Sequence, residues 1–292
     1  MLMNVAAVVA LVVTQQTDTT VPVRAGMRLD VENFGGEIVV RAWNQNSVRV
    51  QATHSSRDRI DVSAERTTVN VRAESRRGLA QMVEYQITAP TWMPLNLHGV
   101  STDIEVDGTQ AAITAETVQG ELKVRGGSGQ LSLKSVQGAV KLQNAKGHID
   151  VYSVNEGLTL ENVNGDISAE TVSGDVTLQG IESANVEVNT VSGDVHYDGT
   201  IKDGGHYRFA THNGDVTLAV PERANVTVSV ATFNGDFDSC FPVSVTTTTK
   251  HRFSFTIGSG SARLELETFN GDIKLCRPGQ LHDKHHDDQE DN

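Results

Sequence analysis

An aspartate follows a glycine repeatedly along this chain, and a regular row of carboxylates is the first feature that could do chemistry. This happens in six copies of a short repeat, at Asp166, Asp175, Asp194, Asp215, Asp236 and Asp272. If the copies stack in space, their carboxylates form a ladder that could bind Ca²⁺ between successive turns. The other interpretation is turn chemistry, because an aspartate beside a glycine caps backbone N–H groups.

The spacing around these aspartates favours the turn interpretation. Repeats that bind Ca²⁺ in β-rolls carry a G-G-x-G-x-D motif, and no run of that motif occurs here. Metal binding stays the alternative hypothesis, and its candidate ligands are Asp166, Asp175, Asp194 and Asp215. We predict no cofactor.

The two cysteines of the chain occupy matched positions. Cys240 and Cys276 each lie five residues after a glycine, in copies that both begin Phe-Asn-Gly-Asp. On adjacent rungs of a stacked repeat their Cα atoms would lie about 4.8 Å apart, which is within disulfide range. We therefore predict a Cys240–Cys276 disulfide, which forms in an oxidising compartment. No C-x-x-C motif for redox or zinc chemistry is present.

The other residues that could do chemistry are dispersed. Histidines of the tail at 282–286 could take up a metal ion, but a flexible tail is the favoured interpretation. Trp43, Trp92 and Tyr85 could stack on a carbohydrate, although packing in the N-terminal region is the simpler expectation. No G-x-S-x-G, H-E-x-x-H or P-loop motif occurs, so the sequence predicts a protein that is not an enzyme.

These residues sit in a repeat that is punctuated by glycine about every nine residues. The glycines of the regular part are Gly120, Gly129, Gly138, Gly147, Gly157, Gly165, Gly174 and Gly193. A short fixed period is typical of a fold in which each unit packs only against its neighbours. Glycine also tolerates the positive φ that a tight bend between strands needs.

Apolar residues recur two and four positions after each glycine. A further set lies two positions before it: Val118, Val136, Val163, Val172, Val191, Phe233 and Phe269. Period-two alternation predicts that these sets share one buried face of short strands. The prediction is an all-β, single-stranded right-handed β-helix, or β-solenoid, with two units and about 18–21 residues per coil. Because Asn-Gly also suits hairpins, an up-and-down antiparallel sheet is the alternative fold.

Composition divides the chain into four parts. The apolar run in residues 1–14 is too short to span a membrane and is typical of a secretory signal peptide. Residues 21–96 read as an irregular β cap region, and 97–277 as the solenoid repeats. Residues 278–292 form an acidic, histidine-containing tail that we expect to be disordered. No later segment could span a bilayer, so we expect an exported protein that is periplasmic, on the cell surface or secreted.

Charge excludes some partners. The formal net charge is −13 and aromatic residues make up only 5% of the chain. A general negative field disfavours nucleic acid and anionic lipid. The expected partner is a protein or glycan surface.

The glycine units resemble those of bacterial putative-adhesin families of unknown function, which repeat short Val-x-Gly-Asp-Val/Ile segments. The resemblance covers about residues 97–275 and includes the closing stretch 260–273. It implies an exported or surface-exposed protein similar to single-stranded right-handed β-helices. The resemblance brings no catalytic residues with it.

Three functions are compatible with these observations. The favoured one is a non-enzymatic, exported, adhesin-like module that uses the long solenoid face to contact protein or glycan, or plays a structural role in the cell envelope. The second is a polysaccharide-active β-helix enzyme, which would need clustered carboxylates and a basic partner in a groove. The third is an envelope accessory protein that binds a partner protein. Fold alone does not decide among them.

Overall fold

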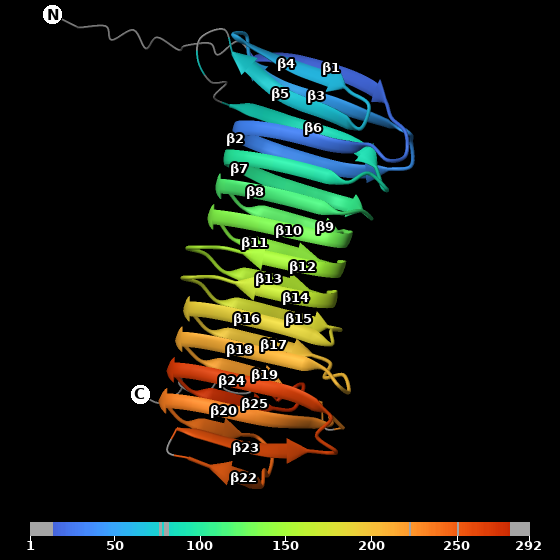
Figure 1. Cartoon of the computed structure of the whole chain (residues 1–292). Helices are drawn as coiled ribbons and strands as arrows, with labels where there is room; N and C mark the ends of the chain where they lie inside the picture. The colour runs from blue at the N-terminus through green and yellow to red at the C-terminus, as the bar shows by residue number, and fades with distance from the viewer. Residues whose placement is uncertain (1–13, 76–77, 79–81, 222, 250, 281–292) are drawn as a thin grey trace, which may run out of the picture.

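Stacked β-strands joined by short turns form the described part of the chain, which covers residues 14–75, 78, 82–221, 223–249 and 251–280 of a computed structural model. Within these residues twenty-five strands and no helix occur, which confirms the all-β prediction. None of the described segments is a helix that could cross a membrane. Figure 1 shows the strands as successive rungs of one elongated body. The predicted signal peptide, apart from Thr14, and residues 281–292 of the predicted tail lie outside the described residues.

The regular part of the molecule consists of two parallel stacks, because each coil contributes one strand to each. Stack A contains β8 (Ile113–Gln119), β10 (Ser128–Gln137), β12 (Lys146–Tyr152), β14 (Asn164–Glu170), β16 (Asn185–Ser192) and β18 (His206–Asn213). Stack B contains β9 (Leu122–Gly126), β11 (Val140–Gln143), β13 (Leu158–Glu161), β15 (Val176–Ile181), β17 (Val195–Gly199) and β19 (Val216–Ala219).

The pairing register sets the length of each coil. One column of paired residues in stack A reads Ile113, Leu131, Ile149, Ile167, Val186 and Tyr207. The steps along this column, from their residue numbers, are 18, 18, 18, 19 and 21 residues. Equivalent positions of successive coils therefore lie directly above one another.

The last coil in sequence is not the last rung of the body. Strand β24 (Ala262–Asn270) lies between β18 and β20 (Val226–Asn234), and it is parallel to both. In the same way β25 (Ile273–Cys276) lies between β19 and β21 (Phe237–Ser239). The chain first builds the outer rung and then returns through β22 (Val245–Thr248) and β23 (Arg252–Ile257) to fill the gap. Figure 1 shows this order at the red end, where β23 pairs antiparallel with β20.

At the N-terminal end, too, neighbouring rungs are not consecutive in the sequence. The long strand β2 (Arg28–Trp43) is parallel to β7 (Leu95–Thr109) on one side, and to β5 (Thr68–Ser75) and β6 (Val83–Pro90) on the other. Antiparallel strands then close this end: β4 (Asp58–Ala64) on β5, and β3 (Ser47–Ser55) on β6, followed by β1 (Thr14–Pro22). These antiparallel strands cover the N-terminal end of the parallel stacks, and at the C-terminal end β23 covers β20 of stack A, which protects exposed sheet edges.

The core fills the space between the stacks with aliphatic side chains in columns. Leu133, Leu142, Leu160 and Leu178 are all fully buried, and their equivalents in other coils are mostly aliphatic, with Tyr197 and Phe209 further along the two stacks. β-branched and aliphatic side chains suit this pleated interior, and burying each one contributes about 1.5–3 kcal/mol. The core therefore extends along the whole body, and its stability comes from many similar side chains and not from one central cluster.

The three dispersed aromatic residues of the N-terminal part do not form an open platform for sugars. Tyr85 is completely buried, and Trp92 packs against the core. Trp43 uses its indole N–H to donate a hydrogen bond of 2.8 Å to the carbonyl oxygen of Ser47. These positions agree with the packing expectation for all three.

Two buried tyrosines give a matched test of this core. The hydroxyl of Tyr85 has no hydrogen-bond partner among the described residues, and burial raises its pKa. The hydroxyl of Tyr207 donates to the carbonyl of Ser183 at 2.7 Å and accepts from the N–H of Lys202 at 2.8 Å. We expect Tyr207→Phe to lower the free energy of unfolding by about 1–3 kcal/mol, while Tyr85→Phe leaves it unchanged or slightly higher. Urea unfolding measures both, and equal losses would contradict the assignment.

Candidate functional site: an exposed apolar ridge beside an aspartate ladder

The two glycine units of one coil occupy different corners of the solenoid. Corner 1 is the turn from a stack A strand to the next stack B strand, and Gly120, Gly138, Gly174 and Gly193 lie there. Corner 2 is the turn from stack B back to stack A, where Gly129, Gly147 and Gly165 are paired in register. Alternate copies of the repeat are therefore not equivalent in space.

The corners differ in where they place the apolar residue two positions before the glycine. At corner 2 Val163 is fully buried, as the repeat predicts. At corner 1 the prediction of a buried side chain is wrong. There the equivalent side chains keep exposed fractions between 37% and 52%: Val118, Val136, Val172, Val191, Phe233 and Phe269.

A column of buried hydroxyl residues explains this difference. The residue immediately before each exposed one points inward, and seven such residues are buried: Thr117, Ser135, Ser153, Thr171, Thr190, Thr211 and Thr268. Each donates a hydrogen bond to the carbonyl oxygen of the corner residue on the neighbouring rung, as Ser135 does to Gly120 and Thr211 to Gly193, both at 3.0 Å. Because the hydroxyl residue takes the inward place and satisfies a buried carbonyl, the next side chain must point outward.

The outward side chains form one straight line along the body, which we call the ridge. Register pairing places its ten members on successive rungs in the order Phe34, Val100, Val118, Val136, Val154, Val172, Val191, His212, Phe269 and Phe233. With rungs about 4.8 Å apart, the ridge is about 43 Å long. Apolar side chains in such a line remain in contact with solvent over nearly the whole regular part of the molecule.

The C-terminal end of the ridge is a stack of four rings. His212 lies on Phe269 with 4.9 Å between ring centroids, Phe269 on Phe233 at 4.9 Å, and Phe233 on His251 at 4.4 Å. The planes of the two phenylalanines are within 3° of parallel. Because both faces of each phenylalanine are covered by another ring, ring edges are what this part of the ridge presents to a partner.

Corner 1 also carries a column of aspartates, which we call the Asp ladder. In spatial order its members are Asp175, Asp194, Asp215, Asp272 and Asp236, which follow the corner 1 glycines. The Oδ1 atom of each of the first four accepts a hydrogen bond of 2.8 Å from the backbone N–H of the next. The carboxylates therefore act as turn caps that join neighbouring rungs.

The structure brings together three of the four aspartates considered as metal ligands. Asp175, Asp194 and Asp215 lie on successive rungs of the ladder. Asp166 lies at corner 2, where it accepts a hydrogen bond of 2.8 Å from the amide of Asn185. No group of three or more His, Cys, Asp or Glu side chains placed to hold a metal ion occurs among the residues described. A metal site on these aspartates stays a hypothesis.

Replacing a ladder aspartate with asparagine distinguishes the effect of its hydrogen bond from the effect of its negative charge. Asp215→Asn keeps an Oδ1 acceptor for the N–H of Asp272 and removes repulsion from the carboxylates above and below, which is at most about 1 kcal/mol per neighbour in water. We expect its stability to equal or exceed wild type by up to about 0.5 kcal/mol in low salt, and the gain to shrink as salt screens the charges. Asp215→Ala should lose about 1 kcal/mol. Urea unfolding at two salt concentrations makes the comparison, and equal losses in both variants would contradict the capping role.

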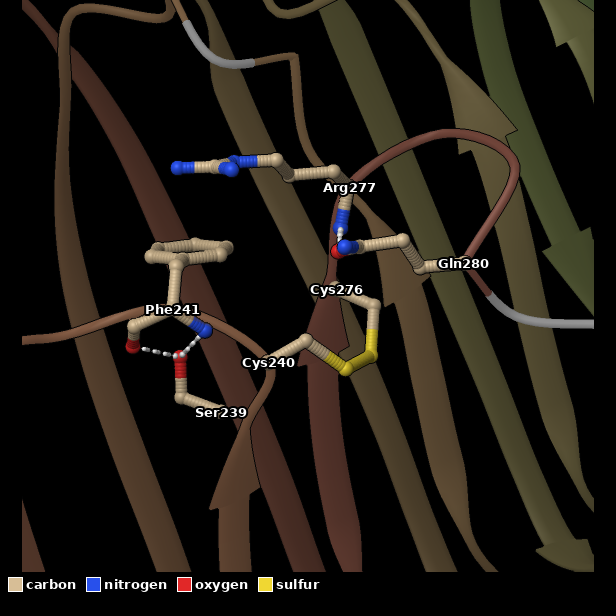
Figure 2. Close-up of a disulfide and its surroundings, with 6 residues drawn as sticks. All are labelled: Ser239, Cys240, Phe241, Cys276, Arg277 and Gln280. Atoms are coloured by element: carbon tan, nitrogen blue, oxygen red, sulfur yellow. Dashed lines mark hydrogen bonds between the residues drawn. A yellow bond between two sulfur atoms is a disulfide. The ribbon is translucent and has the colours of Figure 1, made fainter. Parts of the chain in front are cut away.

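The structure also brings together the two cysteines, which form a disulfide with 4.8 Å between their Cα atoms. Figure 2 shows this bond between the rung that contains β25 and the outer rung that contains β21. Beside it the guanidinium of Arg277 lies over the ring of Phe241, 5.6 Å from its centroid. The bond therefore fastens the outermost parallel rung to the inserted last coil.

A shallow polar groove lies on stack A, away from the ridge. Its lining includes His148, Asp166, Arg208 and Glu265. The guanidinium of Arg208 is already paired with Glu265 at 3.4 Å and with Glu267 at 2.7 Å.

Residues 169–276 match the family model described as Toastrack DUF4097. The match overlaps the segment 97–275, whose repeats resemble an adhesin-like family of unknown function, from residue 169 to its end, and it supports that resemblance for this part of the chain. No curated protein matches the sequence.

Several solved structures are similar to this chain, but only loosely. A putative cell adhesion protein from Clostridium sporogenes ATCC 15579 has 11% identity and a TM-score of 0.24, over 90% of this chain and 99% of its own. A putative lipid binding protein from Parabacteroides distasonis ATCC 8503 has 9% identity and a TM-score of 0.34, over 89% and 96%. A putative adhesin from Parabacteroides merdae ATCC 43184 has 7% identity and a TM-score of 0.28, over 90% and 95%. At these TM-scores the superposition is too loose to transfer details or partners.

Proposed function

We propose that this protein is an exported, non-enzymatic, adhesin-like binding protein of the cell envelope, which contacts a protein or glycan through the ridge. The ridge is the observation that carries this proposal. Five valines and three phenylalanines of the ridge keep between 37% and 52% of their surface exposed. Together they present an area on the order of a few hundred Å². Contiguous apolar surface of this size is at the upper limit for a soluble monomer and often marks an interaction site.

The proposal includes the architecture and division of the chain. The coil is a single-stranded right-handed β-helix of about 18–21 residues per turn, which the stacked register of the coils supports. Residues 1–14 act as the signal peptide, 21–96 as the cap region, 97–277 as the solenoid, and 278–292 as an acidic, histidine-containing tail. The disulfide and the absence of a C-x-x-C motif fit an oxidising compartment.

Binding is favoured over glycan hydrolysis because of how the carboxylates are used. The Asp ladder distributes its side chains one per rung and commits Oδ1 atoms to backbone N–H groups. A hydrolase that cleaves glycosidic bonds needs two carboxyl groups across the scissile bond, free to exchange protons. An envelope accessory role differs from the adhesin-like role only in the partner, so it uses the same surface.

Retention on isolated envelope fractions tests the binding role. The purified protein would be incubated with outer-surface and peptidoglycan fractions, together with the ridge variant Val118→Asn/Val136→Asn. The control Thr159→Asn/Thr177→Asn places the same side chains on stack B, away from the ridge. We expect wild type and control to be retained alike, and the ridge variant to bind about tenfold more weakly. Equal retention of all three proteins, or no retention of any, would contradict the proposal.

A separate reporter tests export. Residues 1–30 would be fused to an enzyme that is active only after translocation and disulfide formation. We expect activity that is lost when a charged residue interrupts the apolar run, for example in Val9→Glu. Equal activity of both fusions would remove the signal peptide from the proposal.

A further inference from the structure

The ridge and the Asp ladder run side by side over five rungs at the C-terminal half of the solenoid. In this part the ridge residues are Val172, Val191, His212, Phe269 and Phe233, each three positions before a member of the ladder: Asp175, Asp194, Asp215, Asp272 and Asp236. Between them lies a polar column in which the amide of Asn234 donates to Asn270 at 2.8 Å and the amide of Asn270 to Asn213 at 2.7 Å. An apolar line and an acidic line thus lie parallel, with amides between.

The negative charge next to this half of the ridge is concentrated on the side of the Asp ladder. The Oδ1 atoms of the ladder are bound to neutral backbone donors, so the column keeps its negative charge. On the other side of the ridge the outward residues of the same rungs are Glu170, Asn189, Ala210, Glu267 and Ala231. Of these Glu267 is paired with Arg208 and Arg252. A complementary partner therefore needs an apolar stripe with positive charge along one side of it.

The spacing of the rungs selects the shape of that partner. Five rungs repeat about every 4.8 Å and extend over about 19 Å. An α-helix laid along them offers one apolar side chain per turn of 5.4 Å, and about 13 residues cover the distance. An extended strand presents side chains on one face only every 6.6–6.8 Å, which falls out of step after two rungs. Leucine or isoleucine side chains of a helix also suit the ring edges exposed by the phenylalanine stack.

We propose that this half of the ridge is the docking site for a basic amphipathic α-helix of a partner protein. The apolar residues of the helix lie on the ridge from Val172 to Phe233, and its Lys or Arg residues face the Asp ladder. Arginine and lysine also reach the amide column between them. This inference rests on the proposed binding function and names the class of partner.

A second copy of this chain does not fit the same surface. The chain has a net charge of −13, and its described residues contain no helix that could occupy the ridge. Two ridges packed against each other in antiparallel fashion would place the acidic ladders on the same side of the contact, where they repel. A glycan is also disfavoured here because the phenylalanine faces that would stack on a sugar ring are covered by other rings.

Binding of designed peptides to the whole protein tests the proposal. The probe is a fluorescent 16-residue helical peptide with leucine once per turn and lysine along one flank, and its partner peptide carries glutamate in place of every lysine. The protein variants are Asp194→Asn/Asp215→Asn/Asp272→Asn, which keeps Oδ1 acceptors, and Val191→Thr/Phe269→Asn on the ridge. Thr159→Asn/Thr177→Asn is the control, because both residues lie on stack B, away from the ridge and the Asp ladder. Far-ultraviolet circular dichroism verifies that each variant is folded.

We expect the lysine peptide to bind, and the glutamate peptide to bind at least about tenfold more weakly. The triple asparagine variant should bind the lysine peptide about tenfold more weakly and with less dependence on salt. The Val191/Phe269 variant should also lose about tenfold, while Thr159→Asn/Thr177→Asn binds as wild type does.

Three results would overturn the inference. The lysine peptide could fail to bind, it could bind every variant equally through general charge attraction, or sedimentation could show a dimer that ridge variants abolish, which would make a second copy the occupant. The envelope-retention experiment distinguishes these failures from failure of the proposed function. Retention that depends on Val118 and Val136, without binding of the lysine peptide, leaves the binding role in place and removes only the helix.

Discussion

Replacing Gly193 with alanine is expected to lower the free energy of unfolding by more than about 3 kcal/mol. A Cβ at this position would lie 2.1 Å from the carbonyl oxygen of Gly174 on the rung below, and the backbone has a φ of +153°. The obstacle is backbone of the neighbouring coil, so no side-chain movement can relieve the clash. The two rungs must separate, which breaks hydrogen bonds and opens the core at corner 1.

Gly204 provides the control for this prediction. Its φ of +73° also disfavours alanine, but an added Cβ there meets no atom within 4 Å. Gly204→Ala should therefore cost only about 1 kcal/mol from backbone strain. Urea unfolding followed by circular dichroism compares the two variants. Similar losses in both would mean that φ, and not the stacking of rungs at corner 1, is why glycine recurs there.

Removing the disulfide is the second change with a large expected effect. The bond closes a segment with a sequence separation of 36 residues, and loop-closure entropy assigns such a crosslink about 4 kcal/mol. It holds the outer rung, whose stack B strand β21 has only three residues, against the inserted coil. We expect Cys240→Ser/Cys276→Ser to lose up to this amount, with the loss concentrated in residues 226–276.

Hydrogen exchange measured by mass spectrometry locates this effect. Exchange in β20, β21 and β25 should accelerate in the double serine variant, and exchange in β10 to β13 should change little. Reducing agent should reproduce the result in wild type and do nothing further to the variant, since the chain has only two cysteines. Uniform acceleration along the whole body, or none, would contradict a local role for the bond.

The repeat predicts much of this architecture because its signal is local. Alternation around each glycine defines short strands, and the period near nine stacks them into coils. The order of the strands at the two ends of the body cannot be predicted in this way. β24 pairs with β18, although Tyr207 and its partner Leu264 are far apart in the sequence. No local sequence pattern indicates that the outermost rung precedes the inserted coil in the chain. The order of rungs there depends on which edges remain open when the chain returns.

The ridge could not be predicted by extending one alternation through every glycine. In a strand that alternates regularly, the residues two before and two after a glycine would point to the same face. Both point into the core at corner 2, but at corner 1 the residue before the glycine points outward. A distinguishing signal is present in the sequence. The units at corner 1 have Ser or Thr directly before the exposed residue, as in Thr190-Val191 and Thr268-Phe269, whereas Val163 follows Asn162. The buried hydroxyl marks which copies turn their apolar residue outward.

The difference between the two corners also determines which aspartates belong to the ladder. All six follow a glycine, so the sequence treats them alike, but Asp166 belongs to a corner 2 unit and the others to corner 1. Only units that are a whole coil apart stack. The sequence can therefore predict that a ladder exists, while assigning its members requires knowing which units share a corner.

The central claim is that the partner binds along the ridge, and hydroxyl-radical footprinting of the protein on a retaining envelope fraction tests it most directly. The account predicts protection of Phe34, Phe233 and Phe269 when the partner is bound, and unchanged labelling of His148 on another column of stack A. Protection of His148, with the three phenylalanines labelled as in the free protein, would place binding on the polar face and contradict the account.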